Sequence, residues 1–175
     1  MNIRDLTVVA VIYISISGCY SPITGRVVDA ETGVPIEEAI VLVEWTKKHG
    51  FGDSVTESFK VVEALSDKYG NVSIEGCNSP FVEPPDVTVY KKGYVAWSNR
   101  WIFPTNEKRQ NFQWTKTTFR LELFKPEYSY IDHTSFIRSS INSSLNLESK
   151  KLIYRAFDWE DQLSSGEMNQ KGIRR

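Results

Sequence analysis

The sequence predicts an all-β fold, a seven-stranded β-sandwich followed by a C-terminal helical extension. Three observations indicate this class. Between residues 23 and 124 the chain consists of short segments rich in β-branched residues, several of them alternating in polarity. Gly, Pro, Asn and Asp separate these segments, as tight turns require. Apolar residues recur at helical spacing only after Pro126.

The first two strands differ in the way they are covered. Residues 23–29 place Ile23, Gly25 and Val27 on one face and more polar residues on the other, which is typical of a half-buried strand. Gly33 and Pro35 then mark a turn. Residues 39–45 are apolar almost throughout, so we expect a central strand that is covered on both faces. One side of it would carry Ala39, Val41, Val43 and Trp45.

Five further strands complete the predicted set. They are expected at residues 57–65, 72–74, 87–91, 94–98 and 117–124. Asp67, Gly70 and Asn71 supply the turn before the second of these. In the last strand the alternation predicts that Phe119, Leu121 and Leu123 face the core.

Two helices are predicted after Pro126. The first carries Phe136, Ile137 and Ile141 at helical spacing, with an N-cap at Asp132 or Thr134. The second has a longer apolar stripe, after a cap at Asn146 or Ser149, and residues 166–175 are expected to fray. Two roles are open for this apolar stripe. It packs against the sandwich, on a face or over a sheet edge, or it binds a partner protein. The stripe consists of Leu152, Ile153, Ala156, Phe157, Trp159 and Leu163.

The N-terminal run from Leu6 to Ile16 is apolar and uncharged. It is too short to span a bilayer, because a spanning helix needs roughly 20 residues. The run follows a short segment containing Arg4 and ends in small residues, an order typical of a secretory signal. The open alternative is a buried first strand, and Asp5 favours it, because acids are unusual at the start of a signal.

The end of this run, Ile16-Ser17-Gly18-Cys19, resembles the lipobox of bacterial lipoproteins. The resemblance implies acylation of Cys19, with a fatty acid such as palmitate, and cleavage before it. An ordinary signal peptide with a structural cysteine is the alternative. Tyr20 follows the cysteine, whereas the Asp that favours inner-membrane retention in many Gram-negative lipoproteins is absent. The resemblance therefore implies a lipid anchor at the cell envelope, in the outer membrane.

These segments divide the chain into three predicted parts. Residues 1–18 would be the signal peptide, residues 19–126 the sandwich and residues 127–175 the helical extension. If Cys19 carries lipid, Cys77 is the one thiol left, and no internal disulfide forms. The formal net charge of −1 lacks the basic excess of nucleic-acid-binding proteins, so no nucleic-acid partner is expected.

The sandwich segment resembles the carboxypeptidase regulatory-like domain, a transthyretin-like, or prealbumin-like, Greek-key sandwich. Ile23-x-Gly25-x-Val27-x-Asp29, Thr32-Gly33-x-Pro35-Ile36 and Ala39-x-Val41-x-Val43 match its start, Ser66-Asp67-x-x-Gly70-x-Val72 its hairpin, and Gly93-Tyr94 its Gly-Tyr pair. Insertions around residues 49–54 and 99–116 depart from the pattern. The resemblance implies a scaffold without chemistry of its own.

The sequence offers little for catalysis, and we expect no enzyme, no metal and no cofactor. The two histidines, His49 and His133, have no neighbours at metal-ligand spacing. Asp132-His133 resembles part of a hydrolytic triad, but no G-x-S-x-G elbow accompanies it, so a hydrolase around His133 is the least favoured function. The acids Glu160 and Asp161 are expected to be solvated charges on a helix.

An aromatic cluster between Tyr90 and Trp114 is the predicted binding surface. Exposed rings can stack on sugars or anchor a protein partner, and core packing is the alternative role for the same rings. The candidate ligand or partner surface comprises Trp97, Trp101, Phe103, Phe112 and Trp114. The sequence therefore predicts a noncatalytic, lipid-anchored accessory or protein-interaction module whose partner is an envelope protein or, as the alternative, a polysaccharide.

Overall fold

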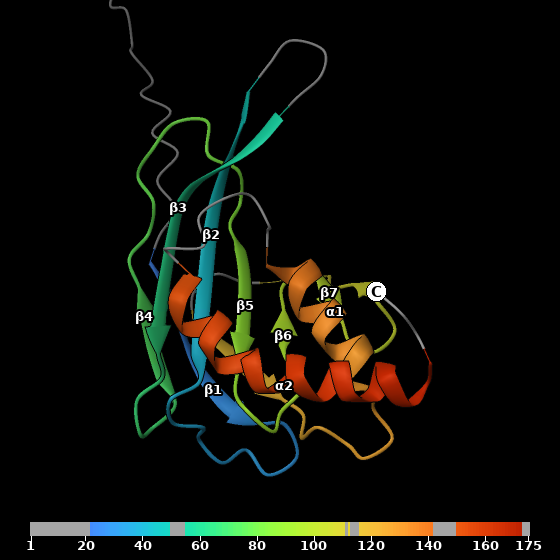
Figure 1. Ribbon diagram of the computed structural model, residues 1–175. Coiled ribbons are helices and arrows are strands. Elements are labelled where there is room, and N and C mark those ends of the chain that lie inside the picture. Colours follow the sequence, from blue (N-terminus) through green and yellow to red (C-terminus); the bar gives the residue numbers. More distant parts are fainter. Residues whose placement is uncertain (1–21, 50–54, 111, 113–115, 142–149, 173–175) are drawn as a thin grey trace, which may run out of the picture.

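A computed structural model describes residues 22–49, 55–110, 112, 116–141 and 150–172 of this 175-residue chain. Strands and two C-terminal helices make up the fold (Figure 1). The elements are β1 (Ile23–Asp29), β2 (Ile40–His49), β3 (Val55–Leu65), β4 (Asn71–Ile74), β5 (Asp86–Tyr90), β6 (Trp97–Ser98), β7 (Trp101–Ile102), β8 (Glu107–Lys108), β9 (Thr117–Leu121), α1 (Tyr130–Ser140) and α2 (Lys151–Gln170).

The described strands form two main sheets. One has the order β4-β1-β9, in which β1 pairs antiparallel with β4 and parallel with β9. The other is antiparallel and has the order β3-β2-β5-β6. Each of the seven predicted strands has a counterpart in these sheets. The short β7–β8 pair is an addition that the sequence did not predict.

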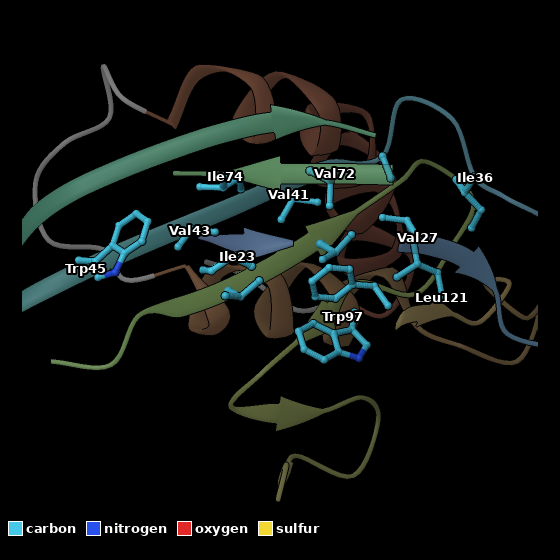
Figure 2. Packing of buried hydrophobic residues seen from close by; sticks show 14 of the residues in the cluster. Ile23, Val27, Ile36, Val41, Val43, Trp45, Val72, Ile74, Trp97 and Leu121 are labelled. Atoms are coloured by element: carbon cyan, nitrogen blue, oxygen red, sulfur yellow. The ribbon is translucent and has the colours of Figure 1, made fainter. Parts of the chain in front are cut away.

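The main core lies between the two sheets. Ile23 and Val27 of β1 pack in one cluster with Val41, Val43 and Trp45 of β2 (Figure 2). Residues from β4, β5, β6 and β9, and from connecting segments such as Ile36 and Val82, complete the cluster. The predicted inward faces of β1 and β2 are therefore confirmed.

The opposite face of the larger sheet is covered by the helices. Ile40 and Leu42 of β2 join a second cluster with Phe136 of α1 and with Ile153 and Phe157 of α2. The helices pack against each other, and α2 passes in front of β2, β5 and β6 while α1 lies toward β7 (Figure 1). Of the two predictions for the second helix, packing on the sandwich is therefore the one that the structure confirms.

Charged side chains of the sheet fix the start of α2. The carboxylate of Glu63 on β3 accepts hydrogen bonds from the backbone N–H groups of Leu152 and Ile153, at 2.9 Å each. This position suits an anion, because the first N–H groups of a helix lack intrahelical partners and carry a positive partial charge. Beside it, Lys150 Nζ lies 2.9 Å from Oε2 of the buried Glu44.

The family-like motif residues build turns. The Asp29 carboxylate accepts hydrogen bonds from the backbone N–H of Thr32, at 2.8 Å, and from its hydroxyl. These bonds lower the pKa of Asp29. The Ser66 hydroxyl donates to Ile36 O at 2.7 Å and accepts from the N–H of Ala39 at 2.8 Å. These residues therefore stabilise the scaffold.

Three details of the strands differ from the prediction. Strand β9 ends at Leu121, and Leu123 is 51% exposed instead of facing the core. The cause is that residues 122–124 leave β1 and hydrogen-bond to residues 93–95, as in the 2.7 Å bond from Val95 N–H to Glu122 O. The predicted strand at 94–98 is correspondingly reduced to Trp97–Ser98.

The helix ends differ as well. The N-cap of α1 is Ser129, whose side chain accepts from the N–H of Asp132, instead of Asp132 or Thr134. The caps predicted for the second helix, Asn146 and Ser149, lie outside the described residues. Helix α2 continues through Gly166 to Gln170, so the predicted fraying does not begin at residue 166.

We expect Gly25→Ala to destabilise the fold, because β1 and β9 approach each other closely at this position. A Cβ there would lie 2.6 Å from Phe119 Cε2 and 2.6 Å from the backbone oxygen of Thr117. Overpacking of this kind lowers the free energy of unfolding by about 2–3 kcal/mol. Urea denaturation measures the loss.

Gly33→Ala is the matched control. Gly33 has a φ of +71° but nothing within 4 Å of an added Cβ, so the variant suffers backbone strain alone, about 1 kcal/mol. Equal losses in the two variants would contradict the close approach of β1 and β9.

Candidate functional site

A surface groove of about 680 Å³ lies between α1 and the chain segment that contains β7 and β8. The residues that line it are Arg100, Trp101, Phe103, Pro104, Asn106, Asp132, Ser135, Phe136 and Ser139.

Aromatic rings form the base of the groove. Phe103 and Phe136 are buried, and their ring centroids are 5.6 Å apart in an edge-to-face arrangement. Trp101 is half-buried and packs against the helix-side cluster. Because Trp101 is the least covered of the three, it is the ring that a ligand can reach.

One wall of the groove is a polar face of α1. Asp132, Ser135 and Ser139 are all exposed and follow one another at intervals of three and four residues, which places them on one side of a helix. Asp132 lies in the first turn, where the helix dipole favours a carboxylate. This wall presents one carboxylate and two hydroxyl groups to the groove.

The facing wall comes from residues 100–106. The Arg100 guanidinium lies 3.2 Å from Asp86 Oδ2 and 5.7 Å from the centroid of the Trp101 ring. Burial raises the pKa of Asp86, and the Arg100 charge opposes this rise. Asn106 adopts a positive φ of 56° and is exposed. Its amide adds a donor and an acceptor to the groove.

This combination suits binding better than acid–base chemistry. Paired carboxylates or a nucleophile beside a base are the usual requirements for hydrolysis. The ionisable groups of the described lining are Arg100 and Asp132, which stand on opposite walls. Hydroxyls, an amide, one carboxylate and an aromatic ring instead match a ligand with hydroxyl groups and apolar faces.

The predicted aromatic surface is divided between two cores. Trp97 is 8% exposed and packs edge-to-face on Phe119 in the core between the sheets, with the half-buried Phe112 beside it. Phe103, also 8% exposed, belongs to the helix-side cluster. Trp114 lies outside the described residues, as does Cys19. The prediction that Trp97 and Phe103 belong to one exposed binding surface is therefore wrong, because each ring fills a different core.

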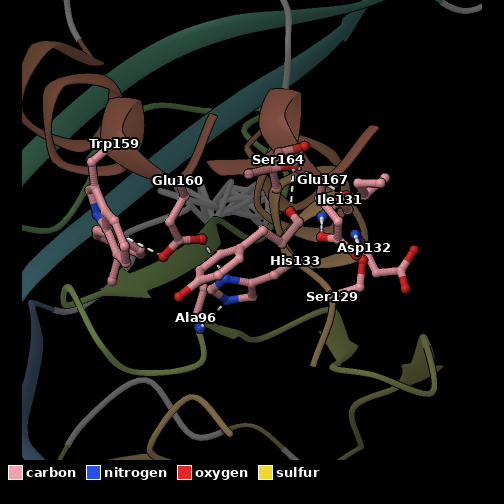
Figure 3. A network of polar contacts seen from close by, with 12 residues as sticks. Ala96, Ser129, Ile131, Asp132, His133, Trp159, Glu160, Ser164 and Glu167 are labelled. Atoms are coloured by element: carbon pink, nitrogen blue, oxygen red, sulfur yellow. Dashed lines mark hydrogen bonds and ion pairs between the residues drawn. The ribbon is translucent and has the colours of Figure 1, made fainter. Parts of the chain in front are cut away.

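His133 is a packing residue that is 0% exposed. Its Nε2 accepts a hydrogen bond from the N–H of Ala96 at 2.8 Å, so the ring proton lies on Nδ1. Nδ1 lies 2.6 Å from Glu160 Oε2 (Figure 3). Because both ring nitrogens are occupied and enclosed, His133 has no access to a substrate in this conformation. The hydrolase hypothesis therefore lacks the general base that it assigned to His133.

The other oxygen of Glu160 extends this network. Glu160 Oε1 accepts from the Tyr90 hydroxyl at 2.9 Å, and that hydroxyl accepts from Trp159 Nε1–H at 2.8 Å. Glu160 is 1% exposed, so its prediction as a solvated charge is wrong. The signal was present in the sequence, because Glu160 follows Ile153 and Phe157 at helical spacing on the apolar stripe of α2.

Neither metal ligation nor membrane crossing is indicated by the described residues. Among them, no group of three His, Cys, Asp or Glu side chains is placed to hold a metal ion. Neither described helix combines the length and the apolar composition needed to cross a bilayer.

Comparisons with known proteins assign no family to this chain. No family model matches the chain, and no curated protein matches it. Among solved structures, it is similar to a Streptococcal ancillary pilin, with 18% identity and a TM-score of 0.32 over 61% of this chain. The match spans 30% of that pilin chain. A TM-score of this size carries no argument about fold or function.

We expect Tyr90→Phe to lower the free energy of unfolding by about 1–3 kcal/mol at neutral pH, because Trp159 Nε1 and Glu160 Oε1 lose a buried partner. Burial and the Glu160 charge also raise the pKa of Tyr90 above its ordinary 10.0. Above that pH the unfolded chain releases the Tyr90 proton while the folded protein retains it. Stability therefore falls as the pH rises.

Denaturation at pH values between about 8 and 11 measures both effects. The variant should lose less stability than the parent protein across this range, because it lacks the hydroxyl that ionises on unfolding. Tyr69→Phe is the control, since Tyr69 is 58% exposed. An identical alkaline slope in Tyr90→Phe and the parent protein would contradict the assignment.

Proposed function

We propose that this chain is a noncatalytic binding module, anchored by a lipid on Cys19 to the cell envelope, where it acts as an accessory or interaction protein. The observation that carries the binding role is the groove, which combines a reachable aromatic ring with polar groups on two walls. The lipobox-like sequence Ile16-Ser17-Gly18-Cys19 carries the anchoring. Anchoring in the outer membrane follows from Tyr20 after the cysteine.

The scaffold in this proposal is the transthyretin-like Greek-key sandwich that the sequence motifs imply. Two sheets of three and four strands, with a shared apolar core, support it. The motif residues Asp29 and Ser66 stabilise turns and do not line the groove. Binding in the groove would therefore depend on residues 100–106, which lie in an insertion that departs from the family pattern, and on α1.

A second candidate function is saccharide binding in the same groove. Sugars have apolar faces that stack on aromatic rings and hydroxyls that hydrogen-bond to carboxylate, amide and hydroxyl groups. Trp101 supplies the ring, and Asp132, Asn106 and Ser135 supply these polar groups. This function uses Trp101 and Phe103 of the predicted aromatic surface but not Trp97.

Metabolic labelling with an alkyne fatty acid tests the anchor. We expect Cys19→Ala to lose the label, because the thiol that would carry the lipid is gone. The variant should also move from the membrane fraction to the soluble fraction, because stable anchoring needs two or more acyl chains. Cys77→Ala is the matched control, since Cys77 is buried and 3% exposed in the core. Full labelling of Cys19→Ala would exclude lipidation at this cysteine.

An array of defined oligosaccharides, probed with the full chain, tests the second candidate. We expect Trp101→Ala to lower the affinity for any glycan that the parent protein binds by more than about tenfold, the usual effect of losing a central Trp in a binding site. Tyr69→Ala removes an exposed ring that is not among the described residues lining the groove, and it should leave binding unchanged. Glycan binding that survives Trp101→Ala, or an array without bound glycans, would rule against this candidate.

A further inference from the structure

A second pocket, of about 410 Å³, lies on the other side of the segment that forms the groove. It is placed where the edge strand of one sheet, β9, meets the edge strand of the other, β6. The two edges are held together by the contact between Trp97 and Phe119, whose ring centroids are 5.1 Å apart. The pocket is therefore built on the rigid core.

Every charged residue in the described lining of this pocket is cationic. Arg109 follows β8, Lys116 precedes β9, and Arg120 lies on β9. Among the described residues, no carboxylate forms an ion pair with any of the three. The remaining polar lining includes Gln110 and Thr118, which can also donate hydrogen bonds. Three positive charges thus line one pocket, and no carboxylate of the described residues compensates them.

Arg109 is pre-organised for an anion. Its Nε donates to the backbone oxygen of Ser98 at 2.7 Å, and its guanidinium lies over the Trp97 ring, 4.7 Å from the centroid. These contacts fix the plane of the guanidinium and leave its two terminal nitrogens to another acceptor. Burial lowers the pKa of Arg109, as expected for a half-buried cation without a counter-charge.

We propose that this pocket binds a phosphate group. A phosphate carries more charge and more acceptor oxygens than a carboxylate, and so it satisfies several converging donors at once. Lys116 and Arg120 are exposed and can close on the group from the side of β9. A neutral saccharide would leave the three cations uncompensated, which separates this pocket from the groove.

Titration of the full chain, in neutral detergent, with inorganic phosphate tests the proposal. Amide shifts of residues 117–120 and the Arg109 Nε–H shift are followed by NMR, with sodium chloride at equal ionic strength as the reference. We expect saturable shifts with phosphate and none with chloride. The double variant Lys116→Gln/Arg120→Gln should weaken phosphate binding by about tenfold or more, because it removes two charge-assisted contacts.

Lys68→Gln/Arg155→Gln is the matched control. It removes the same two residue types and the same charge from exposed positions outside the pocket. We expect phosphate affinity within about twofold of the parent protein. Equal weakening in the two double variants would overturn the proposal, because the effect would then be one of net charge.

Flotation with vesicles, carried out in the Cys19→Ala background so that the proposed lipid anchor does not itself bind the vesicles, distinguishes the two sources of a phosphate group. Stronger binding to phosphatidylglycerol than to phosphatidylcholine vesicles, lost in Lys116→Gln/Arg120→Gln, would assign a lipid headgroup. Saturable binding of inorganic phosphate without a vesicle preference would assign a soluble phosphate compound. The absence of both, in a protein with dispersed amide signals, would overturn the site while leaving the groove and the lipid anchor untouched.

Discussion

Strand β2 is covered on both faces from Ile40 to Trp45, and the rest of the architecture follows from this. A strand that is apolar on both sides needs two separate apolar layers to remove it from water. The sheet containing β1 provides one layer, and α1 with α2 provides the other. The helices are therefore a third layer of the same body, since the larger sheet would expose Ile40 and Leu42 without them.

Polar contacts then fix where the helices lie on that layer. Apolar packing alone is non-directional, whereas hydrogen bonds specify position and orientation. His133 on α1 contacts Glu160 on α2 and the backbone of Ala96, and Tyr90 on β5 contacts Glu160 as well. Glu63 performs the same role at the first turn of α2. Together these contacts align the wall of the groove with the segment that faces it.

Local patterns predicted the fold well, and long-range contacts explain where they did not. The alternation in β1 and the nearly continuous apolar run of β2, broken by Glu44, depend only on neighbouring residues, so their faces were predicted correctly. The face of Leu123 was predicted wrongly, because after Leu121 the chain stops pairing with β1 and hydrogen-bonds to residues 93–95 instead. The position of Glu160 on the apolar stripe of α2 is visible in the sequence, but its partners His133 and Tyr90, which satisfy the buried carboxylate, are distant in sequence and were not predicted.

The candidate site was harder to predict for the same reason. The abundance of rings between residues 90 and 114 is visible in the sequence, but the core that each ring joins depends on the path of the chain. Trp97 and Phe103 are six positions apart and fill different clusters. The polar wall on α1 becomes recognisable only when residues 100–106 are folded against it.

The short excursion between β6 and β9 contributes to both pockets. Residues 100–106 line the groove, while Arg109 and Gln110 line the cationic pocket on the other side. Both proposed binding sites therefore depend in part on this one segment, together with α1 for the groove and β9 for the cationic pocket. Substituting the exposed residues of this segment while keeping the buried Phe103 would alter ligand preference at both proposed sites without opening the helix-side core, which makes the protein a natural starting point for grafted recognition.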